Sequence, residues 1–366
     1  MSGHQAPCRT SAWPHRLLVK QHRLRPIPFS PILVVVAVAL LLAGALFAVG
    51  CGSAASDETT TTAAAAVSTT APAVSTTAPA VSTTASTAAE GTFPVTVADD
   101  NKASVTVSAK PVRIVSTAPA NTEMLFALGV GDRVVGVTSL DDYPSEVAGI
   151  TKIGDFQPNA EAIIGLDPDL VLGYSGNEEA LAPIKSNGVP VLIFNPSTLE
   201  QIYADITTIG AVTGATGKAA ELVDSVKAQI KSVSDAATAA GDSPKVFYAL
   251  DNTLWTAGPG SFVDELLTLA RATNVAAAPG ADGAAAQAFY QFAPEQLVAA
   301  DPDVILLPGS TYKSAEEFTS DPRFAGLTAV KNGRVLVIDD VIVTRPGPRI
   351  ADGLKILAAA IHPGAF

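Results

Sequence analysis

Aromatic side chains occur in loops where an α/β protein would bind a ligand. These loops follow predicted strands or directly precede a predicted helix, and open α/β sheets bind ligands outside the carboxyl ends of their strands. Rings in such positions could stack on a flat, polarisable ligand, although packing against neighbouring side chains is the alternative. The ligand-binding candidates are Tyr143, Phe156, Tyr174, Trp255 and Tyr290.

Residues that could catalyse a reaction are few. Three of the four histidines lie in the first 50 residues, which leaves only His362, so neither a Ser-His-Asp triad nor a histidine-rich metal site is expected. Asp141, Asp142 and Asp251 are the acidic residues in ligand-side loops that an exported α/β enzyme could use. Arg345 could pair with an anionic edge of a ligand or be an ordinary solvated charge. We therefore expect no catalytic residues, no metal site and no cofactor.

Two segments of the chain match each other in register. The segment Phe156 to Gly176, FQPNAEAIIGLDPDLVLGYSG, recurs at Tyr290 to Ser310 as YQFAPEQLVAADPDVILLPGS, and Glu161 is the counterpart of Glu295. Each copy predicts an aromatic loop, a short helix, a turn with proline and a buried apolar strand. Chance similarity is the alternative, but the shared glutamate argues against it. The repeat predicts two similar lobes.

Apolar residues at helical spacing predict one long helix from Thr216 to Ala240. Val223, Val226, Ile230 and Val233 fall on one helical face. At about 1.5 Å per residue the helix would be roughly 35 Å long. A helix of this length between two similar lobes would be a rigid strut.

Strands and helices alternate on both sides of this helix, which predicts an α/β protein with two doubly wound parallel-sheet lobes. The long helix would join the lobes, and the ligand cleft would lie between them. The predicted organisation is a signal peptide (1–50), a disordered Thr/Ala/Pro-rich stalk (51–92), an N-terminal α/β lobe with a leading hairpin (93–212), a connecting helix (213–243) and a C-terminal α/β lobe (244–366).

The first 50 residues are typical of an export signal. Five basic residues and no acidic one accompany an apolar run from Ile32 to Gly50. The following cysteine, Cys51, lies in a segment that resembles a bacterial lipoprotein box, so it is the expected lipidation site. An uncleaved membrane anchor is the alternative, because the run is just long enough to span a bilayer. Either way, the rest of the chain is expected outside the cell, anchored to the outer face of the membrane.

Charge excludes some partners. Removing the leader changes the formal net charge from −12 to −17, because the leader carries five basic residues and no acidic one. This acidity argues against binding to nucleic acid and against adhesion to anionic lipid. The stalk, with VSTTAPA starting at Val67 and Val74, cannot bury a core.

Several motifs, in order, resemble the helical-backbone substrate-binding proteins of bacterial ABC importers, which serve cobalamin and ferric siderophores. They are PVRIVSTAPANTEMLFALG from Pro111, GDFQPNAEAIIGLDPDLVL from Gly154, LWTAGPGSFVDELLTLA from Leu254, ADPDVILLPG from Ala300 and RPGPRI from Arg345. The resemblance extends over about residues 93–363. It is closest to the cobalamin-binding branch, which shares the Pro-Ala-Asn-Thr-Glu run and the Asp-Tyr-Pro loop.

This resemblance implies a monomeric, non-enzymatic receptor that captures cobalamin (vitamin B12), or else a ferric siderophore or haem. It would deliver the ligand to an ABC permease and its ATPase subunits. Aromatic residues from both lobes would cradle the corrin, at the matching positions Tyr143, Phe156, Tyr174 and Tyr290 and in the second-lobe loop at Trp255. Glu161 and Glu295 would be surface carboxylates that dock onto arginines of the permease.

Two other classes of function are compatible with parts of the chain. An exported α/β enzyme would need a clustered acid/base set, for which the three aspartates are the candidates. A cell-wall adhesion module would suit the stalk, but it would not need a two-lobed repeat.

Overall fold

The computed structural model describes residues 91–277 and 287–366. The predicted signal peptide, the stalk and Cys51 therefore lie outside the described residues. Within the described part, no helix combines the length and the apolar character needed to cross a membrane.

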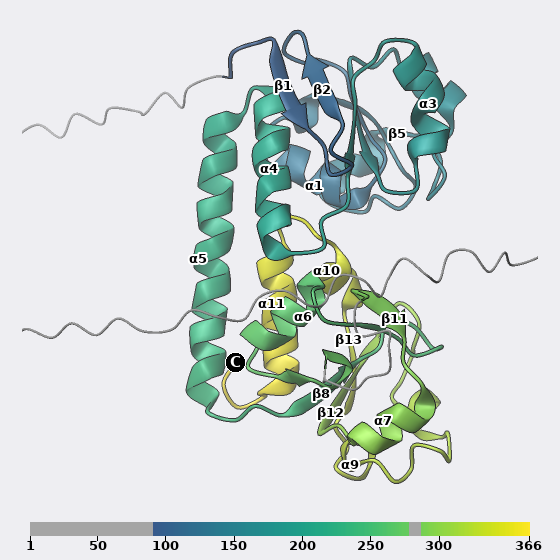
Figure 1. Cartoon of the computed structure of the whole chain (residues 1–366), viewed down its shortest axis with the longest axis vertical. Coiled ribbons are helices and arrows are strands. Elements are labelled where there is room, and N and C mark those ends of the chain that lie inside the picture. Colours follow the sequence, from purple (N-terminus) through teal and green to yellow (C-terminus); the bar gives the residue numbers. More distant parts are fainter. Residues whose placement is uncertain (1–90, 278–286) are drawn as a thin grey trace, which may run out of the picture. The chain divides into compact units, whose positions relative to one another are not determined.

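The first lobe is built on a five-stranded parallel sheet (Figure 1). Its order is β5 (Thr151–Lys152), β4 (Val134–Val137), β3 (Ile114–Ser116), β6 (Leu170–Tyr174) and β7 (Val191–Phe194). Most residues of the central strands β3 and β6 are buried, as expected for a parallel sheet covered on both faces.

Helices and a hairpin surround this sheet. They are the hairpin β1 (Val95–Ala98) and β2 (Ser104–Val107), the helices α1 (Pro119–Ala127), α2 (Ala160–Gly165), α3 (Glu178–Ser186) and α4 (Leu199–Thr213), and the 3₁₀ turns η1 (Gly131–Arg133) and η2 (Ser145–Gly149). A capping box starts α4, since the Thr198 side chain accepts from the Gln201 amide and the Gln201 side chain bonds back.

The second lobe repeats the plan on a smaller scale. Its parallel sheet has the order β10 (Thr273–Asn274), β8 (Lys245–Tyr248), β12 (Val304–Pro308) and β13 (Val335–Ile338). Strands β9 (Trp255–Ala257) and β11 (Phe289–Gln291) form a separate antiparallel pair. The helices are α6 (Phe262–Leu269), α7 (Pro294–Ala300), α8 (Glu316–Thr319), α9 (Thr328–Lys331), α10 (Asp340–Thr344) and α11 (Ile350–Ile361), with the 3₁₀ turn η3 (Val275–Ala277). The predicted α/β class with two parallel-sheet lobes is thus confirmed.

The repeat read from the sequence has the same local structure in both lobes. After α2 and after α7, the aspartates Asp167 and Asp301 adopt left-handed backbone conformations, with φ of 46° and 43°. Two residues later, the carboxylate of Asp169 accepts the backbone amides of Val112 and Arg113, and that of Asp303 accepts the amide of Lys245. Each aspartate thereby fixes the start of the neighbouring strand.

The helix expected from Thr216 to Ala240 is present as α5 with those bounds. In Figure 1 it runs beside α4 and α11, and it packs against both. Its buried face centres on Val226 and Ile230, while Val223 and Val233 are partly buried. Gly241, in a left-handed conformation with φ of 88°, ends the helix.

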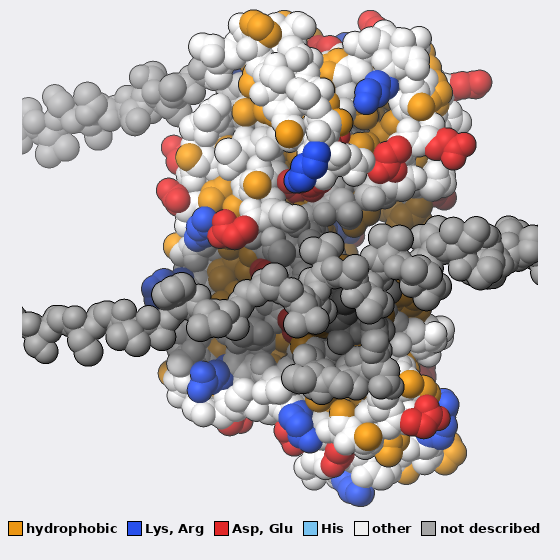
Figure 2. Space-filling model, viewed as in Figure 1, with side chains coloured by type: hydrophobic (Ala, Val, Ile, Leu, Met, Phe, Trp, Pro, Cys, Tyr) orange, Lys and Arg blue, Asp and Glu red, His pale blue; other side chains and the backbone are white. Residues whose placement is uncertain are grey.

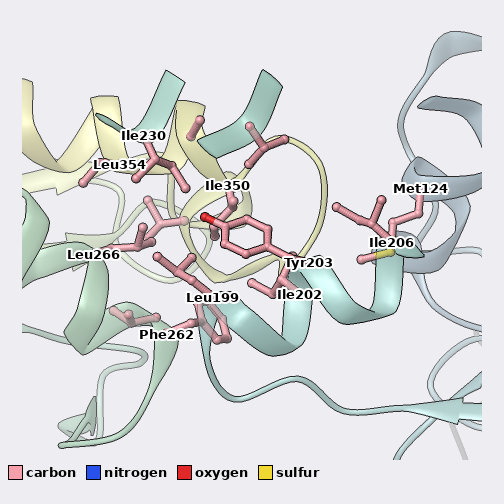
Figure 3. Packing of buried hydrophobic residues seen from close by; sticks show 14 of the residues in the cluster. Met124, Leu199, Ile202, Tyr203, Ile206, Ile230, Phe262, Leu266, Ile350 and Leu354 are labelled. Atoms are coloured by element: carbon pink, nitrogen blue, oxygen red, sulfur yellow. The ribbon is translucent and has the colours of Figure 1, made fainter. Parts of the chain in front are cut away.

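One apolar cluster runs through both lobes and the long helix. Figure 3 shows residues of α4 lying between α1 of the first lobe and α6 and α11 of the second. Ile206 faces Met124, whereas Leu199 lies beside Phe262. In addition, the Leu199 amide donates to the Glu265 carboxylate over 2.9 Å. Because protein cores are close-packed, lobe movements that break this cluster are costly.

Helix α1 starts without a side-chain cap. The helix begins at Pro119, and Ala118 stands at the cap without a side-chain hydrogen bond. Proline at the first helical position is pre-set for a helix and needs no amide partner. The Asn121 and Thr122 side chains instead bond across the lobe, to the Gly173 carbonyl and the Ser116 hydroxyl.

A buried carboxyl group on α4 lacks a complete set of partners. Asp205 is 2% exposed, and its Oδ2 atom has no hydrogen-bond partner. Burial, together with the negative charge of Asp100, raises its pKa to about 8, while Lys102 acts in the opposite direction. Asp205 is therefore protonated in the folded protein at neutral pH.

This pKa predicts how stability changes with pH. A carboxyl group whose pKa is higher in the folded state costs no stability below its unfolded pKa near 3.9, and the cost grows until pH passes 8. Asp205→Asn cannot ionise, so we expect it to unfold at higher urea concentration than the wild type at pH 8. We expect a gain on the order of 2 kcal/mol, below the full value of the shift, that shrinks towards pH 4.

Urea unfolding at both pH values measures this difference, with Asp224→Asn on the exposed face of α5 as the control. A stability difference that does not vary with pH would show that Asp205 is ionised in the folded state.

Candidate functional site

A cavity of about 740 Å³ opens where the two lobes face each other. The first lobe lines it with Thr117, Ala118, Pro119, Ala120, Leu140, Asp142, Phe156, Gln157, Tyr174, Ser175, Gly176 and Asn177, and the second with Ser310, Asp340, Val341, Thr344, Arg345 and Pro346. Most of these residues lie beyond the carboxyl ends of β3, β4, β5, β6, β12 and β13, and the last three lie at the end of α10. Open α/β sheets bind ligands at this edge.

Two of the five predicted aromatic contacts line the cavity. Phe156 is 76% exposed and Tyr174 is 38% exposed. The Phe156 ring has little to pack against in the protein, and the more buried Tyr174 ring still presents part of its face, so both suit stacking on a ligand. Burial raises the pKa of the Tyr174 hydroxyl, so it stays protonated.

The other three aromatic candidates lie elsewhere. The Tyr143 ring lies under the guanidinium of Arg349, 3.9 Å from the ring centroid. Trp255 is 42% exposed on β9, but it is not among the described residues that line the cavity. Tyr290 is only 4% exposed, and its hydroxyl donates to the Ala276 carbonyl over 2.6 Å. In this structure Tyr290 packs within the second lobe.

One amide ties together three segments of the first lobe at the cavity wall. Asn177, 5% exposed, accepts from the Thr117 hydroxyl and donates to the Phe156 carbonyl, each over 2.8 Å. Its own position is at the cap of α3. The loop that carries Phe156 is therefore fixed to the loop after β3, so the backbone from which the exposed ring projects is held at the cavity wall.

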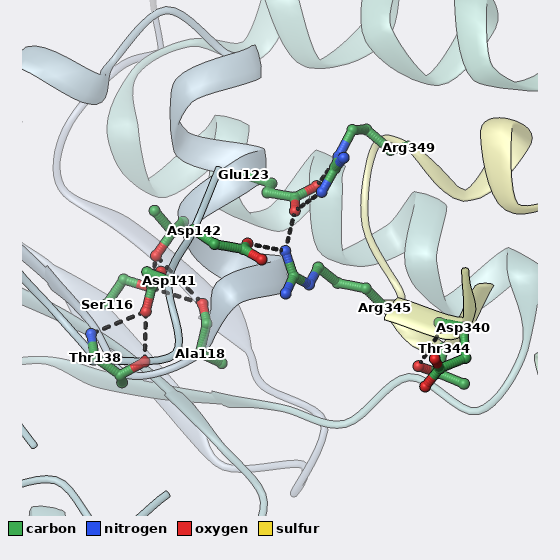
Figure 4. A network of polar contacts seen from close by, with 11 residues as sticks. Ser116, Ala118, Glu123, Thr138, Asp141, Asp142, Asp340, Thr344, Arg345 and Arg349 are labelled. Carbon is green, nitrogen blue, oxygen red and sulfur yellow. Dashed lines mark hydrogen bonds and ion pairs between the residues drawn. The ribbon is translucent and has the colours of Figure 1, made fainter. Parts of the chain in front are cut away.

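Arg345 belongs to an ion cluster that crosses between the lobes (Figure 4). Its Nη1 atom donates to Glu123 on α1 and to Asp142 on the loop after β4, each over 2.7 Å. Arg349 donates to both oxygens of Glu123, over 2.8 and 2.6 Å. The Glu123 side chain is 1% exposed, and a charge so deeply buried needs paired, hydrogen-bonded partners.

The cluster sets the charge at the cavity. Although burial alone would raise the pKa of Asp142, its hydrogen bond and charge pairing with Arg345 bring that pKa below the ordinary value. Asp142 is therefore ionised at neutral pH. It lines the cavity and forms an ion pair with the Arg345 guanidinium. Arg345 is the only basic residue among the described residues that line the cavity, and both carboxylates share it.

On the second-lobe wall, a carboxylate and a hydroxyl form another polar group. Asp340, 8% exposed, accepts from the Ser310 amide over 2.9 Å and from the Ser310 hydroxyl over 2.7 Å. Both residues line the cavity. Ser310 is the repeat counterpart of Gly176, so equivalent strand ends from the two lobes meet at the site.

The three aspartates considered for acid/base chemistry have structural partners. Asp141 is buried, and its Oδ2 accepts from the Thr138 amide and hydroxyl. Asp142 pairs with Arg345, and Asp251 accepts from the amides of Thr253 and Trp255. Within the described residues, no group of histidine, cysteine and acidic side chains could hold a metal ion.

The two predicted docking glutamates lie on exposed first turns of equivalent helices. Glu161 is in the first turn of α2 and Glu295 in the first turn of α7. Neither lines the cavity. Their surroundings differ in one respect, because Arg323, whose pKa is raised chiefly by its hydrogen bond to Asp321, also feels the charge of Glu295.

Sequence reasoning missed most of the polar lining. Thr117, Gln157, Asn177, Ser310 and Asp340 all contribute to the cavity wall. The repeat contained a signal for part of this lining, because its last residues follow β6 in the first lobe and β12 in the second. Asp340 had no such signal, since its place depends on how β13 pairs with β12.

The ion cluster predicts a large loss of stability when its buried member is removed. Glu123→Ala leaves Arg349 without a carboxylate and Arg345 with Asp142 alone, and breaking a buried pair in this way costs about 3–5 kcal/mol. Urea unfolding should show this loss, whereas the exposed Glu161→Ala should stay within about 0.5 kcal/mol of the wild type. A loss below about 1 kcal/mol for Glu123→Ala would mean that the lobes do not depend on the cluster.

Known proteins are similar to this chain in sequence and in fold. Residues 114–342 match the model of a family described as Periplasmic binding protein. An uncharacterized ABC transporter substrate-binding lipoprotein of Bacillus subtilis is 37% identical over 75% of this chain and 87% of its own length. A cobalamin-binding protein of Halobacterium salinarum is 30% identical over 74% of this chain and 75% of its own.

Among solved structures, a periplasmic heme-binding protein from Roseiflexus in apo form superposes with a TM-score of 0.62. It is 30% identical and covers 69% of this chain and 99% of its own. The family match spans more than half of the chain, and this solved structure shares its α/β fold. The chain therefore belongs to the periplasmic binding protein family, as a non-enzymatic substrate-binding protein of an ABC transporter.

Proposed function

We propose that this protein captures cobalamin outside the cell membrane and delivers it to an ABC permease. The observation that carries the choice of ligand is the pairing of Arg345, the basic residue of the cavity wall, with Glu123 and Asp142. A guanidinium that two carboxylates already neutralise has little charge left for an anionic ligand. The cavity therefore favours a ligand without net negative charge.

Cobalamin meets this requirement, because its single phosphodiester is balanced by the positive charge of the cobalt–corrin centre. The edge of its corrin carries uncharged carboxamides, which can bond to hydroxyl and amide groups such as those of Thr117, Gln157 and Ser310 on the cavity wall. Its flat ring suits stacking on Phe156 and Tyr174. A relative named as a cobalamin-binding protein supports this choice.

Haem is disfavoured by the same chemistry. Its two propionates would meet the carboxylates of Asp142 and Asp340 at the cavity wall, and like charges in a partly buried site repel. Among the described lining residues, Tyr174 is the one that could ligate ferric iron. Burial raises the pKa of its hydroxyl, which disfavours the phenolate that would act as the ligand.

A ferric siderophore is the alternative ligand. Catecholate complexes are strongly anionic and meet the same objection as haem. Hydroxamate complexes are neutral or cationic, so the charge of the cavity does not exclude them. They lack a flat macrocycle, however, and would make less use of the exposed rings of Phe156 and Tyr174.

Delivery follows from the position of the protein and from the two glutamates. A lipid on Cys51 would hold the receptor at the membrane surface, and the related Bacillus subtilis protein is named a lipoprotein. Glu161 and Glu295, exposed on equivalent helices of the two lobes, would pair with basic residues of the permease. Lobe closure would be small, because one apolar cluster runs through both lobes.

Calorimetric titration of residues 52–366 tests the ligand. We expect one-to-one binding of cyanocobalamin with a Kd of about 1 µM or tighter, and binding at least about tenfold weaker for haemin. Quenching of Trp255, the one tryptophan that follows the leader, gives a second readout. A cationic ferric hydroxamate complex is the parallel control. Preference for haemin would contradict the charge argument. Preference for the hydroxamate complex would assign a ferric siderophore, rather than cobalamin, as the ligand.

A further inference from the structure

The two docking helices expose more than a carboxylate. On α2, Glu161 is followed three residues later by Ile164, which is 41% exposed, and on α7 Glu295 is followed by Val298, which is 47% exposed. Residues three apart lie on the same face of a helix. Each lobe therefore presents a carboxylate beside an aliphatic side chain.

The fold does not require these aliphatic side chains on the surface. The preceding residues, Ile163 and Leu297, anchor the two helices in the core and are completely buried. Along both helices the alternation of exposed, half-buried and buried positions is the same, from Glu161 to Leu166 and from Glu295 to Ala300. Two lobes with different sequences thus keep one pattern on one exposed face.

Small residues complete each surface. Gly165 follows Ile164, and Ala299 follows Val298; both are exposed. A Cβ atom added at Gly165 would meet nothing within 4 Å, so a partner could approach the backbone closely there. We define the first-lobe patch as Glu161, Ile164 and Gly165, and the second-lobe patch as Glu295, Val298 and Ala299. At the end of the molecule that carries α7 in Figure 1, Figure 2 shows hydrophobic side chains exposed among charged ones.

We infer that Ile164 and Val298 are docking contacts, and that each inserts into an apolar recess beside a basic residue on one of two identical permease subunits. The inference rests on the proposed function, because it assigns new residues to the docking face of the receptor. The repeat indicates which partner covers the patches. Two equivalent patches on one chain fit a partner that offers the same surface twice, such as two identical permease subunits. The carboxylate in each patch requires a cation on that partner.

The aliphatic contact adds what the carboxylates lack. Exposed ion pairs contribute little and weaken with salt, whereas an aliphatic side chain buried in a recess contributes at any ionic strength. The carboxylates would then steer the encounter and set the orientation, and Ile164 and Val298 would slow dissociation.

Photo-crosslinking in cells identifies the partner of each patch. p-Benzoylphenylalanine is placed at position 164 or 298 of the full chain, with position 337 as control, because Val337 is a 36% exposed valine on the edge strand β13. We expect positions 164 and 298 to crosslink to the same integral membrane permease polypeptide, and position 337 to give no such product. No permease product at 164 and 298, or two different polypeptides, would overturn the inference.

Binding to right-side-out membrane vesicles from the same cells measures the contribution of the side chains. The double variant Ile164→Ser/Val298→Ser should bind the vesicles about tenfold or more weakly, and Val337→Ser should stay within about twofold. The weaker binding of Ile164→Ser/Val298→Ser should persist at high salt. The weaker binding of Glu161→Ala/Glu295→Ala should not, because that variant removes only charge. A serine double variant within about twofold of the wild type would contradict the inference.

Titration of each variant with cyanocobalamin separates this inference from the proposed ligand. Unchanged cobalamin affinity beside lost docking supports the assignment of Ile164 and Val298. If the protein binds no cobalamin but its docking still depends on Ile164 and Val298, the docking contacts are supported and the proposed ligand is overturned.

Discussion

The buried carboxylate of Glu123 constrains most of what surrounds the cavity. A charge at 1% exposure is stable only when partners neutralise it, and both of its basic partners, Arg345 and Arg349, come from the other lobe. Those two arginines flank the loop that leads into α11. The same contacts bring Tyr143 under Arg349 and Asp142 against Arg345. Lobe arrangement and cavity charge therefore depend on one cluster.

The apolar cluster shared by α4, α5, α6 and α11 acts with this ion cluster. The apolar cluster joins the lobes along the long helix, and the ion cluster joins them at the cavity wall. Two separate attachments leave little freedom for a hinge, so the cavity exists before the ligand arrives. A preformed cavity with fixed loops, such as the loop of Phe156 held through Asn177, reduces the ordering cost of binding.

The sequence predicted the repeat, the two parallel-sheet lobes and the bounds of α5, because these depend on local periodicity and on matched segments. It also placed Phe156 and Tyr174 at the cavity, since both stand at strand or helix ends within the repeat. It could not place Tyr290 or Trp255, whose positions depend on the pairing of β9 with β11, a contact across many residues. Nor could it show that Arg345 is neutralised, because Glu123 is 222 residues away in the chain.

The central claim is that pairing of Arg345 makes the cavity select a ligand without net negative charge, and Asp142→Asn tests it most directly. Asp142 is 62% exposed, so the substitution removes one of the two carboxylates that pair with Arg345 Nη1 with little risk to folding. The account predicts that haemin affinity rises by about tenfold, the effect of removing one nearby charge, while cyanocobalamin affinity changes by less than about threefold. Glu161→Gln, outside the cavity, is the control. Unchanged haemin affinity in Asp142→Asn would contradict the account.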